Sequence, residues 1–257
     1  MIAAVIIVAA GSSTRMGMGR KKEYLALSGK PVIQHTCEAF LSSERFHYMC
    51  IVAPPSGIGT ARRILGPFLQ RATAMYSVNA AGGTGDSAGH SAADDAGPVQ
   101  LAVSFTEGGA TRQQSVLNGL RALEPAAPDY ILIHDGARPW ISTDCICTVL
   151  DQTAVHGACA PVIVPPDAIK RIDADGFISD HFSRKDTLGI QTPQGFRFRD
   201  ILQAHEAAAV DGWKYIDDTE IYSRYVEPVF TVAGEAANRK ITYAHDFSTG
   251  TLQPNSI

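Results

Sequence analysis

The sequence has few cysteines, and their spacing does not indicate a disulfide or metal framework. Five cysteines occur among 257 residues, an odd number, whereas disulfide-stabilised domains carry paired cysteines. Cys145 and Cys147 are separated by one residue, not by two as in a C-x-x-C motif. We therefore expect reduced thiols that mostly pack in the interior of a cytoplasmic protein. The other cysteines are Cys37, Cys50 and Cys159.

The sequence also lacks an excess of positive charge and a long apolar run. A net charge of -4 and a pI near 6.0 argue against general nucleic-acid binding, which requires a basic surface. Residues 1–10 are apolar, but no basic residues precede them and the run is too short to cross a bilayer as a helix. A buried parallel strand explains this run better, because such strands are apolar on both faces. We expect neither a nucleic-acid nor a membrane partner.

The remaining apolar runs predict an α/β fold. Short runs bounded by turn residues predict strands at 48–53, 99–105, 130–133, 158–164 and 229–232. Helical spacing of apolar residues follows Pro31, where proline suits the first helical position, and recurs at 116–123 and 146–150, the latter preceded by capping side chains at 142–144. This alternation predicts an open, mainly parallel sheet with helices on both faces. Ligands should then bind beyond the carboxyl ends of the strands.

Two segments depart from this pattern. Residues 79–98 are rich in Gly, Ala, Ser and Asp and have no apolar period, which predicts a mobile surface insertion. Residues 165–192 are polar and hairpin-like, with a turn expected at 173–176. We expect this second segment to form an arm that projects from the sheet.

The first strand is followed by a small-residue loop and a basic run. The loop reads Ala9-Ala-Gly-Ser-Ser-Thr-Arg-Met-Gly17, and Arg20-Lys-Lys-Glu-Tyr24 comes next. Small residues let backbone N–H groups approach a polyphosphate, which the cations would neutralise. The P-loop pattern is absent, and the dinucleotide fingerprint lacks its third glycine because Lys22 stands there. The sequence therefore favours a phosphate-binding loop of another type, with an ordinary solvated turn as the alternative.

Two further strand ends carry unusual sequence. Gly108-Gly-Ala-Thr-Arg-Gln-Gln-Ser115 opens a helix and suits contact with a pyrimidine base through backbone amides and Ser115; a glycine turn with a helix cap is the alternative. Asp135 and Arg138 follow another strand, where the carboxylate could bind ribose hydroxyls or help to hold Mg2+ and the guanidinium could hold a phosphate. A structural ion pair is the alternative there.

Five motifs in order give the chain a family resemblance. The sequence resembles the 2-C-methyl-D-erythritol 4-phosphate cytidylyltransferases of the non-mevalonate isoprenoid pathway, over most of its length apart from 79–98. The resemblance implies one Rossmann-like nucleotidyltransferase domain over residues 1–257 with a projecting β-arm, and a homodimer in which the arm of residues 165–192 reaches the partner subunit. The motifs are Ala9-Ala-Gly-Ser-Ser-Thr-Arg-Met-Gly, Gly108-Gly-Ala-Thr-Arg-Gln-Gln-Ser-Val, His134-Asp-Gly-Ala-Arg-Pro, Thr192-Pro-Gln-Gly-Phe and Asn238-Arg-Lys-Ile-Thr.

The resemblance also implies a reaction and its residues. CMP would pass from CTP to 2-C-methyl-D-erythritol 4-phosphate, a small polyol phosphate, with release of pyrophosphate and formation of 4-diphosphocytidyl-2-C-methyl-D-erythritol. Mg2+ is the expected cofactor, held mainly through the CTP triphosphate and by no set of protein ligands. The implied catalytic residues are Arg15 and Lys22 on the leaving side and Arg184 and Lys240 on the attacking phosphate. The implied nucleotide-binding residues are Ala9, Ala10, Gly11, Gly109, Arg112, Ser115, Asp135 and Gly136. The implied acceptor-binding residues are Arg138, Asp167, Thr192, Asp217 and Thr242.

The chain departs from the family pattern at several of these places. Relatives usually carry Pro-Lys-Gln where this chain has Lys21-Lys-Glu23, so Lys21 competes with Lys22 for the role of key lysine. Ala110 replaces an acidic residue, Ala168 replaces a threonine, and Asp-Asp-Thr at 217–219 replaces Thr-Asp-Glu or Thr-Asp-Asp. Two other functions stay open: a ribitol-5-phosphate cytidylyltransferase, which shares the fold and most nucleotide motifs, and a nucleotide-binding module without catalysis.

Overall fold

The computed structural model describes residues 1–11, 21–79 and 101–251 of the chain. Arg15 lies outside the described residues. The predicted insertion at 79–98 does so too except for Asn79, which ends helix α2 (Ile58–Asn79).

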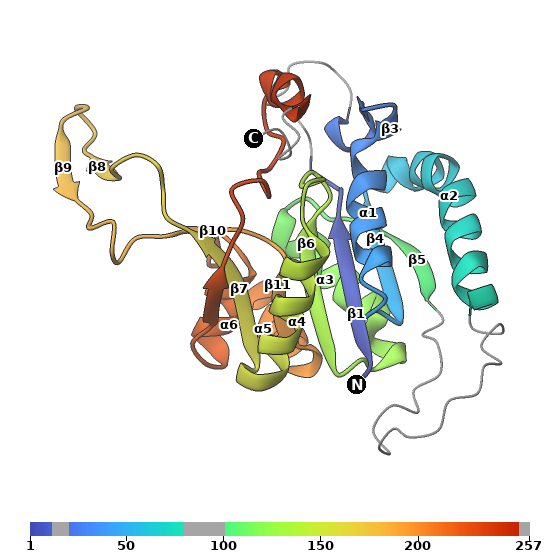
Figure 1. The fold of residues 1–257 in the computed structure, drawn as a ribbon. Helices are drawn as coiled ribbons and strands as arrows, with labels where there is room; N and C mark the ends of the chain where they lie inside the picture. Colours follow the sequence, from blue (N-terminus) through green and yellow to red (C-terminus); the bar gives the residue numbers. More distant parts are fainter. Residues whose placement is uncertain (12–20, 80–100, 252–257) are drawn as a thin grey trace, which may run out of the picture.

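A mixed but mainly parallel sheet forms the centre of the described structure (Figure 1). The strand order is β10-β7-β11-β6-β1-β4-β5, and β12 pairs with β7. Neighbours among β6, β1, β4 and β5 are parallel, as are β12 and β7. The predicted fold class is confirmed, although β5 lies slightly later than the predicted run at 99–105. The bounds are β1 (Ala3–Val8), β4 (Tyr48–Ala53), β5 (Ala102–Glu107), β6 (Tyr130–Asp135), β7 (Ala158–Ile163) and β12 (Phe230–Ala233).

Two strands of the sheet run against the others and were not predicted separately. β11 (Gln194–Arg197) lies between β6 and β7 and pairs antiparallel with both. β10 (Gly189–Ile190) pairs antiparallel with β7. Both strands are short and contain glycine, which weakens any strand signal in the sequence. They return the chain from the arm to the centre of the sheet.

Helices cover both faces of this sheet (Figure 1). Successive side chains of β1 alternate: Val5 and Ile7 share a core cluster with residues of α1, α2 and α4, whereas Ala4 and Ile6 pack with residues of α3 and α5. Because both faces are covered, the strand is apolar throughout, as expected. The helices besides α2 are α1 (Val32–Ser42), α3 (Arg112–Leu123), α4 (Thr143–His156), α5 (Phe198–Val210) and α6 (Asp218–Tyr225).

Three of these helices were not predicted from the sequence. α2 contains Pro67 in its interior, a residue that normally ends or kinks a helix. The buried face of α5 includes the polar His205 and two alanines, and the short α6 buries Asp218. Polar and small residues on a buried face reduce the apolar periodicity from which a helix is predicted.

Helix starts were predicted with mixed success. The Ser142 hydroxyl accepts a hydrogen bond from the Cys145 amide at 3.0 Å, so the predicted capping of α4 is confirmed. The prediction that Pro31 is the first residue of α1 is wrong. Pro31 belongs to the small strand β3 (Lys30–Pro31), paired with β2 (Ala26–Leu27), and its backbone is extended with ψ 141°. The helix therefore begins one residue later, at Val32.

A hairpin projects away from the sheet where the sequence predicts the arm (Figure 1). It consists of β8 (Lys170–Ile172) and β9 (Ile178–His181), which pair antiparallel. Its turn lies at the predicted position, because the Gly176 amide donates to the Asp173 carbonyl at 3.3 Å. Apolar side chains stand in solvent here: Phe177 is 72% exposed and Ile172 is 66% exposed.

The contact between β11 and α4 gives a stability prediction. A Cβ at Gly195 would lie 2.1 Å from the Thr153 hydroxyl, which is buried and donates to the Val149 carbonyl at 2.6 Å. We expect Gly195→Ala to lower the free energy of unfolding by about 1–3 kcal/mol, as overpacking does, measured by urea denaturation. In a Thr153→Ala background the loss should be smaller, because the overlapping hydroxyl is gone. An equal loss in both backgrounds would contradict this account.

Candidate active site

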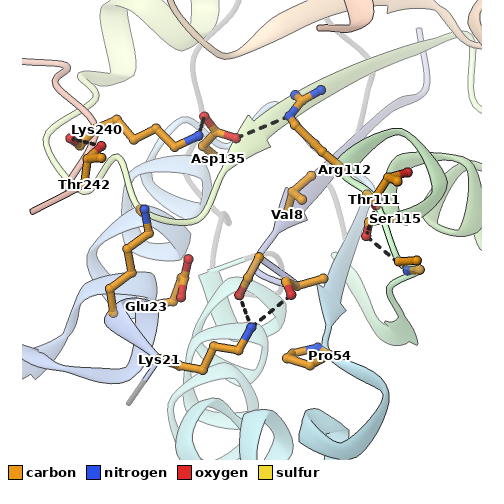
Figure 2. Close-up of a pocket in the computed structure, with 16 residues that line it drawn as sticks. Val8, Lys21, Glu23, Pro54, Thr111, Arg112, Ser115, Asp135, Lys240 and Thr242 are labelled. Carbon is orange, nitrogen blue, oxygen red and sulfur yellow. Dashed lines mark hydrogen bonds and ion pairs between the residues drawn. The ribbon is translucent and has the colours of Figure 1, made fainter. Parts of the chain in front are cut away.

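A polar cavity of about 590 Å³ lies at the carboxyl ends of the parallel strands (Figure 2). This is the edge at which open α/β sheets bind ligands, and the volume is that of a small-molecule site. The segments after β1, β4, β5 and β6 contribute to its wall, together with residues 21–23 and the late segment 238–242. The residues that line it are Val8, Ala10, Gly11, Lys21, Lys22, Glu23, Pro54, Gly109, Ala110, Thr111, Arg112, Ser115, Asp135, Ala137, Lys240 and Thr242.

The buried carboxylate of Asp135 is the electrostatic centre of this cavity. Lys240 Nζ lies 2.8 Å from its Oδ2, Arg138 Nε lies 3.6 Å from the same atom, and Arg112 Nε lies 3.7 Å from Oδ1. Burial alone would raise the pKa of Asp135, but the three cations outweigh it and hold the pKa far below its usual range. Asp135 is therefore ionised and organises the cations around it.

The two neighbouring lysines reach the cavity in different ways. Lys22 is buried, and its Nζ donates to the Ile241 carbonyl at 2.6 Å. Lys21 donates to the carbonyls of Ala10, at 2.9 Å, and Gly11, and burial lowers its pKa despite the nearby carboxylate of Glu23. Lys21 thus holds the loop after β1, whereas Lys22 is tied to the late segment. Both lysines line the cavity, and the choice between them stays a prediction.

The amino end of α3 is built from side chains that bind its own backbone. Thr111 caps the helix by accepting from the Gln114 amide at 3.1 Å. The Ser115 hydroxyl accepts from the Gly109 amide at 3.1 Å and donates to the Thr111 carbonyl at 2.8 Å. A Cβ at Gly108 would lie 2.3 Å from the Cβ of Ala10, so only glycine lets this loop approach the loop after β1. The capping alternative is present, and the same residues also line the cavity.

Residues 238–242 form a strap that carries Lys240 to Asp135. The strap is held by Asn238, which is fully buried and donates to the Thr192 carbonyl at 2.8 Å. Arg138 donates to the Asn238 carbonyl at 2.7 Å, and the Ile241 amide donates to the Ala137 carbonyl at 2.8 Å. These bonds place Lys240 and Thr242 in the wall of the cavity.

Several predicted site residues have structural contacts instead of facing the cavity. Thr192 is buried; its hydroxyl lies 3.1 Å from His134 Nδ1 and accepts from the Asp135 amide at 3.1 Å. Arg138 spans Asp135 and the strap and is absent from the cavity wall. Neither side chain is among the residues that line the cavity, and the predicted role of Thr192 and Arg138 in acceptor binding stays a prediction.

Other predicted residues lie at the margin or elsewhere. The amides of Ala9 and Gly136 continue the sheet ladder by donating to the Val52 and Val8 carbonyls at 2.8 and 2.9 Å, so both lie beneath the cavity wall. Asp217 caps α6 by accepting from the Glu220 amide at 3.1 Å, a role that threonine in relatives could equally perform. Asp167 and Arg184 are exposed on the arm segment, away from the cavity residues of the same chain.

Two fully buried residues near the site, Asp218 and His205, are not among the predicted site residues. Asp218 accepts a hydrogen bond from Arg112 at 2.7 Å, and His205 Nε2 lies 3.2 Å from the other oxygen of Asp218. Arg112 and Asp218 are 106 residues apart in sequence. A charged residue buried in a helix that was not predicted gives little local signal. The signal available in the sequence was the presence of Arg112 and Asp218 themselves, because each charge needs a partner if it is buried.

The cavity contains two carboxylates that could contribute ligands to Mg2+. Asp135 and Glu23 line the cavity, and no group of three or more His, Cys, Asp or Glu side chains suited to a metal occurs within residues 1–11, 21–79 and 101–251. Mg2+ is commonly held by one or two carboxylates together with substrate phosphates. An ionised Asp135 in a cavity that also contains Lys21, Lys22, Arg112 and Lys240 fits that arrangement.

A strand-end cavity with Gly11 and Gly109 in its wall and with converging cations is the kind of site that binds phosphate groups in open α/β sheets. The chain belongs to the family IspD: 2-C-methyl-D-erythritol 4-phosphate cytidylyltransferase, whose model matches residues 3–252. The resemblance inferred from the motifs is thereby confirmed. Among the described helices, none is long and apolar enough to span a membrane.

Individual relatives agree with this assignment. The 2-C-methyl-D-erythritol 4-phosphate cytidylyltransferase of Synechocystis sp. is 35% identical over 95% of this chain and 93% of its own. The bifunctional enzyme IspD/IspF of Bradyrhizobium diazoefficiens is 36% identical over 95% of this chain but 54% of its own, so the chain spans about half the length of such relatives. The crystal structure of the cytidylyltransferase from Thermus thermophilus is 27% identical, with a TM-score of 0.68 over 97% of both chains.

Ionised Asp218 gives a prediction for the pH dependence of stability. Burial opposes its ionisation, but Arg112 and His205 outweigh burial and lower its pKa from 3.8 to about 2. A carboxyl with a lowered pKa stabilises the folded state above its unfolded pKa and loses that contribution as the pH falls through the folded value. We expect the free energy of unfolding to fall between about pH 4 and pH 2. Urea denaturation should show a shallower fall for Asp218→Asn; an unchanged profile would contradict this.

Proposed function

We propose that this chain transfers CMP from CTP to 2-C-methyl-D-erythritol 4-phosphate. The products are pyrophosphate and 4-diphosphocytidyl-2-C-methyl-D-erythritol. The observation that carries the proposal is the cavity at the carboxyl ends of β1, β4, β5 and β6, which Lys22 lines together with Arg112 and Lys240, two of the cations paired with Asp135, in a chain of this family. A cationic cavity next to the amino end of a helix suits a nucleoside triphosphate.

The reaction needs positioning and charge stabilisation more than covalent help. A phosphate oxygen of the acceptor attacks the α-phosphorus of CTP, and the bond from that phosphorus to the pyrophosphate oxygen breaks. Lys22 and Arg15 stabilise the charge on the leaving side, while Lys240 and Arg184 hold the attacking phosphate. Mg2+ bound through the triphosphate supplies further neutralisation of the phosphate oxygens. The buried ammonium of Lys22 and the tethered Lys240 support these roles, because both are held in place by contacts with other segments.

The nucleoside would lie against the start of α3. Gly109, Ala110 and Thr111 line the cavity there, and the small side chains of the first two leave room for a base. Arg112 and Asp135 border the same space. We infer that the ribose and base occupy this end, with the triphosphate toward Lys21 and Lys22.

The arm supports a homodimer with composite sites. Arg184 and Asp167 lie on the arm segment and outside the cavity wall of their own chain, and the hairpin exposes Phe177 and Ile172. Exposed apolar side chains on a projecting hairpin suit a protein contact. We infer that the arm reaches the cavity of a second copy. The cytoplasmic location expected from the reduced cysteines stays a prediction.

Replacement of single lysines tests the assignment of the leaving side. We expect Lys22→Met to lower kcat about 100-fold or more, as loss of a preorganised charge at a developing anion does. Lys21→Met should have a smaller effect, because that ammonium binds the carbonyls of Ala10 and Gly11. Pyrophosphate release with CTP and Mg2+ is the assay. Lys30→Met is the matched control, because Lys30 is exposed and paired with Glu38. Turnover by folded Lys22→Met at the wild-type rate would refute the role.

The acceptor is tested by direct comparison. Pyrophosphate release is measured with CTP, Mg2+ and either methylerythritol phosphate or ribitol 5-phosphate at equal concentration. We expect a strong preference for methylerythritol phosphate. Preference for ribitol 5-phosphate would retain the CTP site and change the acceptor. Binding of CTP without pyrophosphate release with either compound would favour the nucleotide-binding module.

Mixed dimers test the composite site. A Lys22→Met chain and an Arg184→Ala chain should each be weakly active alone, since every site lacks one group. In a mixed dimer, one site receives both defects and the other receives intact Lys22 and the partner's intact arm. Random mixing should therefore restore about a quarter of wild-type activity, by the symmetry of a two-fold dimer. No recovery in dimers shown to have exchanged subunits would refute the shared site.

A further inference from the structure

A series of alternating charges runs from the α5 and α6 layer to the cavity. Asp218, the first residue of α6, is 0% exposed, and its Oδ2 accepts from Arg112 Nη2 at 2.7 Å. Its Oδ1 lies 3.2 Å from His205 Nε2. On the cavity side, Arg112 Nε lies 3.7 Å from Asp135 Oδ1. Arg112 therefore links a fully buried carboxylate to the carboxylate at the centre of the site.

Arg112 lies at a position where a cation is unfavourable. It is the first residue of α3, and the amino end of a helix favours negative charge. Asp218 lies at the corresponding end of α6, where a carboxylate is favoured. The charge of each residue therefore compensates the other, and removal of Arg112 leaves the fully buried carboxylate of Asp218 without its main partner. Packing alone does not require a cation at the first residue of α3. The presence of Arg112 in the cavity wall therefore needs another explanation.

The anchor determines how the guanidinium meets the cavity. A guanidinium is planar and carries five N–H donors in a fixed fork, so the bond from Nη2 to Asp218 restricts the direction of the remaining donors. Figure 2 shows Arg112 extended toward Asp135 from the start of α3. Lys240 holds the closer position on Asp135, at 2.8 Å. Without Asp218, Arg112 would be free to compete with Lys240 for that carboxylate.

We propose that Asp218 is a positioning residue for the nucleotide site, which anchors Arg112 so that its guanidinium remains open to the nucleotide instead of closing onto Asp135. The proposal rests on the proposed function, in which Arg112 borders the ribose and base. On the other side of the carboxylate, His205 Nε2 lies 3.2 Å from Asp218 Oδ1. Asp218 itself does not touch the substrate, since it is buried behind Arg112.

The test measures CTP affinity in the presence of Mg2+ by isothermal titration calorimetry. Asp218→Asn keeps the shape of the side chain and removes its charge; we expect CTP binding to weaken at least about tenfold, as for loss of one partner of a buried pair. Asp211→Asn is the matched control in the same helical layer, because that carboxylate contacts Tyr215 and Arg224 and should leave affinity within about twofold. Circular dichroism establishes that each variant is folded.

A double-mutant cycle separates positioning from a purely structural role. If Asp218 acts through Arg112, Asp218→Asn should cause little further loss of CTP affinity in an Arg112→Ala background. Equal losses in both backgrounds would overturn the proposal, and so would wild-type affinity in a folded Asp218→Asn variant. If that variant does not fold, Asp218→Glu keeps the charge and displaces it; the proposal requires weaker CTP binding, and unchanged binding overturns it.

The same measurements distinguish this proposal from the proposed function. A wild-type protein that binds CTP but releases no pyrophosphate with either acceptor would refute the transferase reaction, while the comparison of affinities would still decide the role of Asp218. Normal wild-type turnover together with unchanged CTP affinity in Asp218→Asn would support the transferase reaction and refute the positioning role of Asp218.

Discussion

The ionised carboxylate of Asp135 is the interaction on which the site depends. It ends β6 in the interior, where an unpaired charge would be strongly destabilising. Arg112, Arg138 and Lys240 approach it from three different segments of the chain. The anion therefore attracts these cations to the sheet edge. Without the carboxylate, these cations would repel one another. With the carboxylate between them, they form a surface suited to phosphates.

The loops at this edge are held by backbone contacts that extend the sheet. The amides of Ala9, Gly108 and Gly136 donate to carbonyls at the ends of neighbouring strands. Side chains must be small where these loops meet, as the short distance from a Cβ at Gly108 to Ala10 demonstrates. The same small residues leave room for a ligand above the strands. Packing and ligand access thus impose the same residue types at these positions, which explains why a capping role and a binding role could not be separated in the sequence.

The sequence and the structure agree best where a pattern is local. The apolar runs of β1 and β4 and the cap at Ser142 were predicted from adjacent residues, and the structure contains them. The prediction for Pro31 was wrong because the pairing of β2 with β3 keeps it extended. Thr192 and Arg138 were predicted to bind the acceptor, a role that stays a prediction, and the structure shows their side chains in contact with His134 and with the strap.

The sequence by itself determined the alternation of strands and helices, the edge of the sheet at which the cavity lies, and the family. Each depends on short apolar periods or on motifs of adjacent residues. Only the tertiary structure decided which charges meet. The pairing of Arg112 with Asp218 joins residues 106 positions apart, and the strap brings Lys240 back to Asp135. Such contacts follow from the path of the whole chain and from the low dielectric of the interior, which makes every buried charge require a partner.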